Sequence, residues 1–331
     1  MTKLNVNRRK LLTAATTAGL ATAFGLPMLS KGAMAQAAGK EYVFLSIVTQ
    51  VPFWVDYRNA MKDLEELMGI KATFTGPLDF DTAAQARQLD ELIARRPAGI
   101  MIFPGDPATL APGVERAVAA GIPVTCCIGD IPESPRSTFL GINGVQAGRV
   151  GGEMLAQAIG GKGKVILGTF PAPSTLERVE GYKEIFAEKY PDIEVVDVIN
   201  DKADPSYAPT AYLQAIQANP DIVGIGGTDG DSGKGAAIAV NEAGRKDIKI
   251  VAMDRNDDML PYIEDGTIYG AVAQKSYLEI FLAFHMMHWQ NTDALKILPD
   301  WKAAGINPLP ERVETGVMPI TAENVAQFKH V

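Results

Sequence analysis

From Glu41 onward, the sequence predicts an α/β fold built from two doubly wound parallel-sheet lobes. Short apolar runs rich in β-branched residues alternate with longer amphipathic segments, a pattern typical of repeated β-α units around a parallel sheet. These units form two successive series, and a length of 331 residues suggests about two domains. Two sheets therefore fit the order of elements better than one sheet does.

The expected elements of each series follow from the position of the apolar runs. The first series has strands at 41–48, 71–75, 99–103 and 122–128, with helices at 54–68, 82–95 and 107–120. The second has strands at 164–169, 193–199, 222–226, 248–253 and 268–273, with helices at 144–160, 176–189, 207–218, 233–244 and 257–265. A long apolar helix at 276–290 has no following strand in the second series, so we expect it to return to the first sheet.

The first 35 residues have the composition of an export signal. They contain five Lys and Arg residues but no Asp or Glu, and a weakly apolar stretch runs from Leu11 to Leu29. Ala33-Met34-Ala35 then provides a small-x-small cleavage pattern, so we expect cleavage near Ala35 and a periplasmic location. The alternative, a membrane anchor, is disfavoured by the Thr, Gly and Pro residues in the stretch. The pair Arg8-Arg9 makes the signal similar to the twin-arginine type, which exports folded proteins.

Charge and cysteine content exclude several classes of protein. Removal of residues 1–35 lowers the formal net charge from −8 to −13, because it takes five cations and no anion. An acidic chain is a poor nucleic-acid binder. The adjacent Cys126 and Cys127 are badly placed to bridge each other or to hold zinc, so we expect them to pack in a buried strand. His285 and His288 lie one helical turn apart without a third ligand nearby, which favours a packed or surface pair over a metal site.

The candidate site follows from the residues that come directly after the expected strands, where open parallel sheets bind ligands. Phe53 and Trp54 follow the first strand after Pro52. Aromatic side chains suit sugar recognition, because the C–H faces of a pyranose pack on aromatic rings while its hydroxyls need hydrogen bonds. The alternative is that both rings only pack the first helix against the core. Because neighbouring residues cannot face the same side of a helix, we expect at least one ring to line a pocket.

Polar residues after the other strands indicate the same chemistry. A carboxylate accepts hydrogen bonds through both oxygens and can bridge neighbouring hydroxyls, and an amide both donates and accepts. The candidates of this kind are Asp130, Thr228, Asp229, Asp254 and Gln274. Two structural alternatives remain open: Asp130 organises the turn before Pro132, and Asp231 caps the helix that follows it. The glycine-rich run at 226–235 departs from a phosphate-binding loop, no dinucleotide motif follows the first strand, and we expect no cofactor and no metal.

Five motifs in order give the chain a family resemblance over residues 40–331. They are Val51-Pro52-Phe53-Trp54, Ala120-Gly121-Ile122-Pro123-Val124, Glu177-Arg178-Val179-Glu180-Gly181-Tyr182, Met253-Asp254 and Ala273-Gln274. On these motifs the chain resembles the ribose-binding-protein-like periplasmic substrate-binding proteins of ABC transporters. The resemblance implies three hinge segments that cross between the lobes, near 141–146, 274–277 and 310–318, and a ligand cleft between the lobes. It divides the chain into a first lobe of 40–143 plus 276–310 and a second of 144–275 plus 311–331.

The resemblance also assigns roles to residues. It implies ring stacking by Phe53 and Trp54, hydroxyl binding by Asp254, hinge-side hydrogen bonding by Gln274, and a place at the second lobe's edge of the cleft for Arg178. The alternative for Arg178 is a structural pair with Glu177 or Glu180. The chain departs from the pentose-binding pattern, which has an Asn in place of Val51 and an Asp-Arg pair in place of Ile128-Gly129. These departures argue against ribose itself.

The leading functional prediction is a monomeric, non-enzymatic receptor for a monosaccharide or sugar-like polyol that it delivers to an ABC permease. A second interpretation is a receptor for a sugar-like signal, which engages a chemoreceptor or sensor kinase. A third is an exported enzyme that uses two of Asp130, Asp229 and Asp254 as acid and base. The sequence shows no nucleophile-His-Asp order or metal-ligand cluster that would favour the enzyme.

Overall fold

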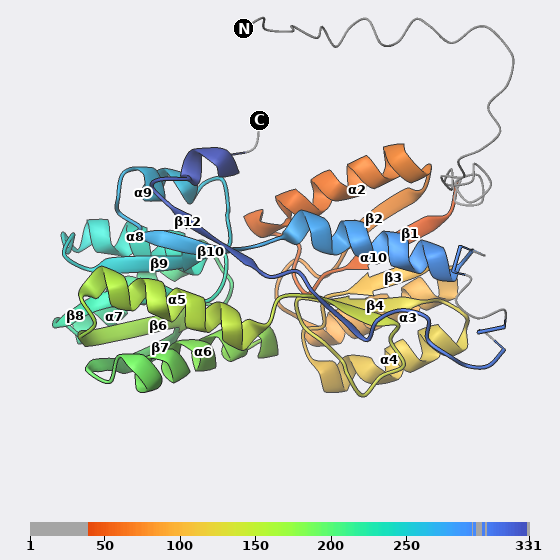
Figure 1. The fold of residues 1–331 in the computed structure, drawn as a ribbon, viewed down its shortest axis with the longest axis horizontal. Helices are drawn as coiled ribbons and strands as arrows, with labels where there is room; N and C mark the ends of the chain where they lie inside the picture. Colours follow the sequence, from red (N-terminus) through yellow and green to blue (C-terminus); the bar gives the residue numbers. More distant parts are fainter. Residues whose placement is uncertain (1–38, 293, 296–299, 302, 330–331) are drawn as a thin grey trace, which may run out of the picture.

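The predicted α/β fold with two doubly wound lobes is confirmed (Figure 1). A computed structural model describes residues 39–329 apart from 293, 296–299 and 302, so the expected export signal and its cleavage near Ala35 lie outside the described residues. Each lobe contains a six-stranded sheet, with the order β11-β5-β4-β3-β1-β2 in the first and β12-β10-β9-β8-β6-β7 in the second. The lobes lie end to end along the long axis of the molecule.

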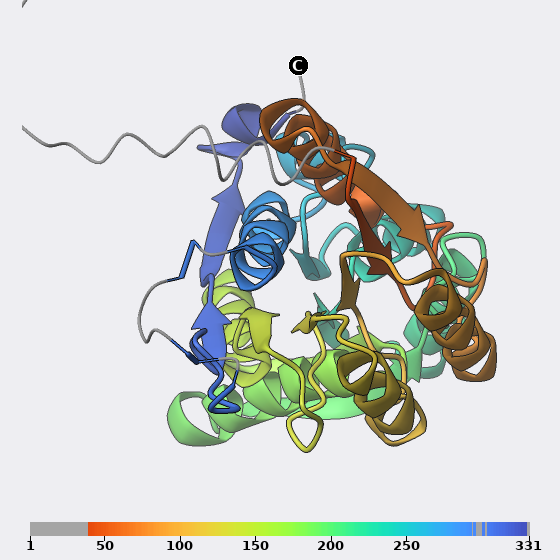
Figure 2. The ribbon, with the colours of Figure 1, turned by 90° about the vertical axis from the view of Figure 1, so that its right-hand side faces the viewer.

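The first lobe has a fully parallel sheet covered by helices on both faces. Its strands are β1 (Glu41–Leu45), β2 (Lys71–Thr75), β3 (Gly99–Ile102), β4 (Val124–Cys127), β5 (Thr138–Gly141) and β11 (Arg312–Glu314). The helices are η2 (Pro52–Trp54), α2 (Val55–Met68), α3 (Thr82–Arg95), α4 (Pro107–Ala119) and α10 (Ser276–Gln290). One core packs α2 and α10 on the sheet and another packs α3 and α4 on its opposite face (Figure 2). The apolar helix at 276–290 thus returns to the first lobe, as expected.

The second lobe repeats this arrangement with one antiparallel edge strand. Its strands are β6 (Gly163–Thr169), β7 (Ile193–Asn200), β8 (Ile222–Gly227), β9 (Lys249–Met253), β10 (Gly270–Gln274) and β12 (Val317–Thr321). The helices are α5 (Gly144–Ile159), α6 (Pro173–Lys189), α7 (Ala208–Ala218), α8 (Ser232–Glu242), α9 (Leu260–Glu264) and η3 (Val325–Phe328). Only β12 runs against its neighbour, β10, within this described sheet.

The chain passes between the lobes at three places. It crosses at Ile142-Asn143 after β5, at Lys275 after β10, and at Thr315-Gly316 between β11 and β12. The assignment of 311–331 to the second lobe needs correction, because β11 pairs in parallel with β5 of the first sheet. The first sheet therefore continues to Glu314, and the last crossing follows it.

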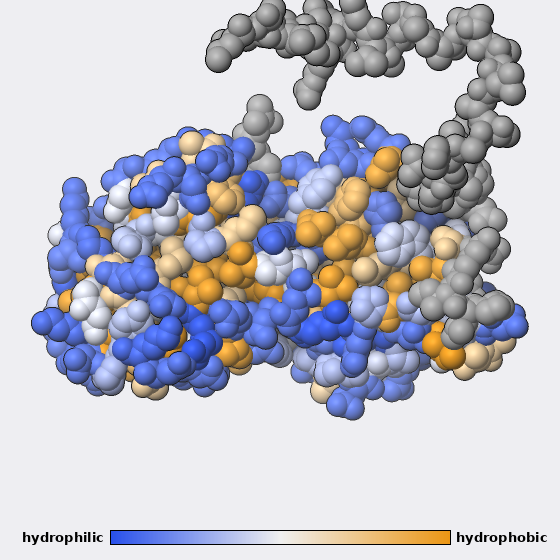
Figure 3. Space-filling view, viewed as in Figure 1, coloured by the Kyte–Doolittle hydropathy of each residue, from blue (hydrophilic) through white to orange (hydrophobic). Residues whose placement is uncertain are grey.

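The surface seen in Figure 3 is mostly hydrophilic at the outer ends of both lobes, with apolar side chains gathered toward the middle of this face. Among the exposed apolar side chains are Tyr277 and Leu278 of α10. No described helix combines the length and apolar character needed to cross a membrane.

Candidate functional site

A pocket lies between the two lobes, at the carboxyl ends of both sheets. The empty space between its walls is about 460 Å³, a figure that includes space open to solvent. The first lobe contributes Val48, Val51, Phe53, Trp54, Phe103 and Ile128. The second lobe and the crossing contribute Phe170, Ser174, Thr175, Arg178, Ala203, Asp229, Gly230, Asp231, Asp254 and Gln274. The pocket thus collects six of the eight predicted site residues.

Trp54 lines the pocket and packs in the core at the same time. Its side chain is 1% exposed, and its indole Nε1 donates a hydrogen bond to the carbonyl oxygen of Val48 at 2.7 Å. Its ring meets Phe53 edge-on, with the ring centroids 4.7 Å apart, and Tyr57 at 5.1 Å. The two interpretations of the aromatic pair are therefore compatible, since a ring fixed by neighbouring rings offers a rigid surface to a ligand.

Asp254 and Gln274 form the polar floor of the pocket near the second crossing. Gln274 Nε2 donates to Asp254 Oδ1 at 2.8 Å, and the Asp254 backbone N–H donates to Val272 O at 2.9 Å. Asp254 is 4% exposed and holds a φ of 67°, in the left-handed region. Burial raises the pKa of Asp254 to about 6, although the Arg178 charge and the Gln274 hydrogen bond oppose that rise. The buried charge of Asp254 would thus be stabilised by a hydrogen bond from a ligand or removed by a proton.

Arg178 reaches the pocket from α6. Its Nη1 donates to the carbonyl oxygen of Thr228 at 2.7 Å, and its side chain is almost fully buried. Close contact between α5 and α6 fixes its backbone, since a Cβ at Gly148 would lie 2.0 Å from Arg178 O. The alternative pairing with Glu180 is not observed, because Glu180 contacts Lys183 at 3.2 Å. Arg178 therefore points its guanidinium at the pocket.

Four buried polar atoms that line the pocket have no hydrogen-bond partner among the described residues. They are Ser174 Oγ, Arg178 Nε, Arg178 Nη2 and Gln274 Oε1. A buried polar atom left unpaired costs about 1–3 kcal/mol, so such atoms are rare in folded proteins unless a ligand or water completes them. These four atoms belong to a hydroxyl, a guanidinium and an amide, and donors and acceptors of such different types suit a ligand with several hydroxyls.

Asp229 and Asp231 lie at the start of α8, and Asp229 rather than Asp231 bonds the first N–H groups of the helix. Asp229 Oδ1 accepts from the backbone N–H groups of Asp231 and Ser232, both at 3.0 Å, and its Oδ2 accepts from Ser232 Oγ at 2.6 Å. Asp231 makes no side-chain cap bond and instead lines the pocket. Burial raises the pKa of both carboxyls, that of Asp231 to about 7 with the Asp229 charge adding to the rise. The Asp229 side chain thus bonds the N–H groups at the start of α8, while Asp231, for which capping was the alternative role, lines the pocket.

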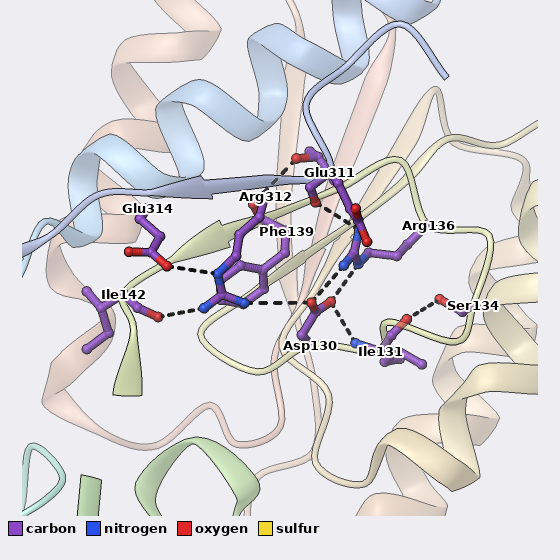
Figure 4. Close-up of polar contacts among 10 residues, drawn as sticks. Asp130, Ile131, Ser134, Arg136, Phe139, Ile142, Glu311, Arg312 and Glu314 are labelled. Carbon is purple, nitrogen blue, oxygen red and sulfur yellow. Dashed lines mark hydrogen bonds and ion pairs between the residues drawn. The ribbon is translucent and has the colours of Figure 1, made fainter. Parts of the chain in front are cut away.

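Two of the predicted site residues, Thr228 and Asp130, lie outside the pocket lining. Thr228 Oγ1 donates a hydrogen bond to Gly168 O of β6 at 2.9 Å, so its hydroxyl is bonded within the second lobe. Asp130 accepts from Arg136 Nε at 2.6 Å and from Arg136 Nη2 at 2.7 Å (Figure 4). Arg312 of β11 lies 3.9 Å from the same carboxylate and donates to Ile142 O in the first crossing at 3.2 Å. Asp130 therefore belongs to a structural cluster that joins the loop between β4 and β5 to β11 and the first crossing.

An ion pair and a ring contact bridge the lobes across the cleft. Arg255, after β9, binds Asp56 of α2 through two hydrogen bonds of 2.9 and 3.1 Å. Phe80 of the first lobe meets Phe170 of the second, with the ring centroids 5.8 Å apart. These contacts hold the walls of the pocket together in the structure described.

His285, His288 and the two cysteines lie in the first lobe, away from the pocket lining. His285 Nδ1 lies 2.8 Å from Phe281 O, and His288 Nδ1 lies 3.4 Å from the Tyr42 hydroxyl. Within the described part of the chain, no group of three or more His, Cys, Asp and Glu residues is placed to hold a metal. Cys126 and Cys127 are buried free thiols in β4.

Comparison with known proteins gives relatives over most of the chain. The xylitol-binding protein of Mycolicibacterium smegmatis is 26% identical over 271 residues, which cover 80% of this chain and 76% of that protein. The ribose import binding protein of Bacillus subtilis is 26% identical over 229 residues, or 69% of this chain and 73% of that protein. Each is a relative of this chain at modest identity.

Solved structures repeat the two-lobed fold. An arabinose binding protein from Geobacillus stearothermophilus has a TM-score of 0.74 at 28% identity and covers 88% of this chain and 100% of its own. A solute-binding protein from Burkholderia graminis, solved in complex with D-arabinose, has a TM-score of 0.80 at 26% identity and covers 89% and 99%. Residues 42–290 match the periplasmic binding protein domain. Because this match spans most of the chain, the protein belongs to the periplasmic binding protein domain family.

Proposed function

We propose that the protein is a solute-binding protein that captures a monosaccharide or sugar-like polyol in the interlobe pocket and delivers it to an ABC permease. The observation that carries the proposal is the group of unpaired buried polar atoms of Ser174, Arg178 and Gln274 beside the aromatic wall. Relatives that are named for binding xylitol, ribose and arabinose support the same ligand class.

The pocket offers each part of a sugar a suitable partner. Asp254 and Asp231 accept hydrogen bonds from hydroxyls, Arg178 and Ser174 donate, and Gln274 Oε1 accepts. The rings of Phe53 and Trp54 pack on C–H groups. Since the pocket holds three aspartates against one arginine, a neutral ligand suits it better than an anion does.

Ligand exchange needs the lobes to separate. The three crossings are short, and Arg255 forms an ion pair with Asp56 across the cleft. Hinge opening at the crossings would expose the pocket, and a ligand that contacts both lobes would favour the closed form. An ABC permease would then recognise the closed, loaded protein.

Binding is tested by isothermal titration and thermal shift of the mature protein against monosaccharides and polyols, including D-arabinose, D-ribose, D-allose and xylitol. We expect at least one to bind and to raise the melting temperature. Absence of binding over a broad panel would refute the proposal, and turnover of a bound sugar to product would favour an enzyme instead.

Location and partner need tests of their own. We propose that residues 1–35 direct export and that cleavage near Ala35 yields a periplasmic monomer, which N-terminal sequencing and sedimentation of the mature protein would check. Deletion of the neighbouring permease genes should abolish uptake of the bound sugar. Uptake that persists while a sugar response is lost would favour the signal-receptor interpretation.

A further inference from the structure

The two walls of the pocket differ sharply in chemistry. The first-lobe wall consists of Val48, Val51, Phe53, Trp54, Phe103 and Ile128, and the one polar side-chain group among them, the indole N–H, is bonded to Val48 O. The opposite wall carries a hydroxyl, a guanidinium, an amide and three carboxyls. The hydrogen-bonding capacity of the lining side chains therefore lies on one side.

Nearby polar side chains of the first lobe are turned to other partners. Ser46 Oγ donates to Val48 O at 2.6 Å. Gln85 is fully buried and spans Phe103 O at 2.6 Å and the Gly105 N–H at 3.0 Å. Over the part of the chain that the structure describes, no polar side chain of the first lobe other than Trp54 lines the pocket.

Ile128 contributes its side chain to the apolar wall although its backbone conformation is strained. Ile128 has a φ of 62°, in the left-handed region where a β-branched residue is an outlier. Glycine or asparagine adopts this conformation far more readily, and asparagine would also supply a hydrogen-bonding group. The chain instead places an aliphatic side chain at this point of the wall.

We propose, on the basis of the proposed function, that the ligand is an amphipathic polyol: a deoxy sugar or deoxy polyol whose reduced or methyl-bearing edge faces the first lobe. A fully hydroxylated sugar carries hydroxyls around its whole perimeter, and those that face Val48, Val51 and Ile128 lose water without gaining a partner. A methyl or methylene in the same place gains from burial. The hydroxyls of the ligand then gather on the side of Arg178, Asp254 and Gln274.

The test compares sugars that differ by one oxygen. Isothermal titration of the mature protein would use L-fucose with L-galactose, L-rhamnose with L-mannose, D-fucose with D-galactose, and 2-deoxy-D-ribose with D-ribose. We expect the tightest ligand of the set to be a deoxy member, bound about 10-fold or more tightly than its hydroxylated partner. If every pair that binds prefers its hydroxylated member, the inference is wrong while sugar binding stands. If no sugar in this set or in the broad panel binds, the proposed function fails and the inference fails with it.

Variants of the apolar wall test independently whether that wall sets the preference for a deoxy ligand. Ile128→Asn and Val51→Asn each place an amide on the first-lobe wall, and we expect each to reduce or reverse the preference for the deoxy member. Arg178→Gln on the polar wall serves as the matched control, because it should weaken both members of a pair and leave their ratio within about threefold. A preference that stays unchanged in both asparagine variants would show that the first-lobe wall does not set it.

Discussion

Replacement of Asp254 by asparagine should make the protein more stable at neutral pH and impair its binding. The carboxyl is 4% exposed, accepts one hydrogen bond from Gln274 through Oδ1, and lines the pocket. Asparagine has nearly the same shape, can accept the same bond and tolerates a φ of 67° better than most residues. The substitution Asp254→Asn therefore removes the negative charge with little change in packing.

The size of the stability effect follows from the raised pKa of Asp254. Burial raises that pKa from 3.8 to about 6, so the folded protein holds the proton more tightly than the unfolded chain does. The stability contributed by the protonated carboxyl is complete below about pH 4 and is lost as the pH rises through about 6. The loss amounts to about 3 kcal/mol, at 1.4 kcal/mol for each pKa unit. Because asparagine does not ionise, the variant should gain about that much over the wild type between pH 4 and pH 7.

Binding should change in the opposite direction. The free oxygen of a carboxylate accepts strong hydrogen bonds from ligand hydroxyls, and an amide offers an N–H in its place. We expect a loss of about 2 kcal/mol, or roughly 30-fold in Kd at pH 7. The matched control is Asp130→Asn, which removes a carboxylate that binds Arg136 outside the pocket. That variant should keep its affinity and lose stability.

Urea unfolding of the ligand-free protein from pH 4 to pH 8, together with titration of the best ligand, measures both effects. A difference in unfolding free energy between Asp254→Asn and wild type that stays constant over this pH range would refute the assignment of a buried, ionising carboxyl. Equal affinity of variant and wild type would refute the placement of Asp254 in the binding site.

Three further substitutions test Arg178 in the pocket, the buried Glu279 of α10 and the contact between Asp56 and Arg255. Arg178→Gln should weaken binding by about 2 kcal/mol, because it removes two unpaired buried donors, whereas Arg149→Gln on the exposed face of α5 should leave the titrated Kd unchanged. Burial raises the pKa of Glu279 to about 7, so the stability of the wild type should fall as the pH rises from about 4.5 through 7. Because glutamine does not ionise, Glu279→Gln should gain roughly 3 kcal/mol in unfolding free energy over the wild type across that range, as measured by urea unfolding. Asp56→Asn weakens the ion pair with Arg255 across the cleft, so it should lower the ligand affinity by about fivefold. The ligand-free variant should also have a larger radius of gyration than the wild type in small-angle scattering. An unchanged radius would argue against a role of this pair in closure.

Hydrophobic periodicity was sufficient to predict most of the fold, and two of the strands that it missed lie at the sheet edges. Strands such as β9 and β10 are continuous buried runs and were predicted within a few residues of their observed ends. The strands β5, β11 and β12 were not predicted. β11 has three residues, Arg312–Glu314, with little buried surface, and it exists because it pairs with β5. Edge pairing of this kind depends on tertiary contacts, which local sequence patterns do not contain.

Strand order explains why much of the site could be predicted. Parallel strands end at one edge of a sheet, so residues directly after β9 and at the end of β10, such as Asp254 and Gln274, must lie close together. The same rule could not decide where a side chain turns after its strand. Asp130 turns toward Arg136, six residues later, and Ser174 enters the pocket from the start of α6, at no strand end. These choices depend on loop conformation and on partners that sequence spacing does not identify.

The pocket is also where the protein departs from locally favoured structure. Ile128, Ala203 and Asp254 all line it and all have a φ in the left-handed region, at 62°, 51° and 67°. Each such residue costs on the order of 1–3 kcal/mol unless its surroundings hold it in place. The unpaired atoms of Arg178 and Gln274 add to the same cost. A ligand that completes these hydrogen bonds would recover part of that free energy, and its contacts with the apolar wall of the first lobe would then favour closure. Stabilising substitutions at these positions, such as Asp254→Asn, should therefore stabilise the ligand-free protein and weaken ligand binding.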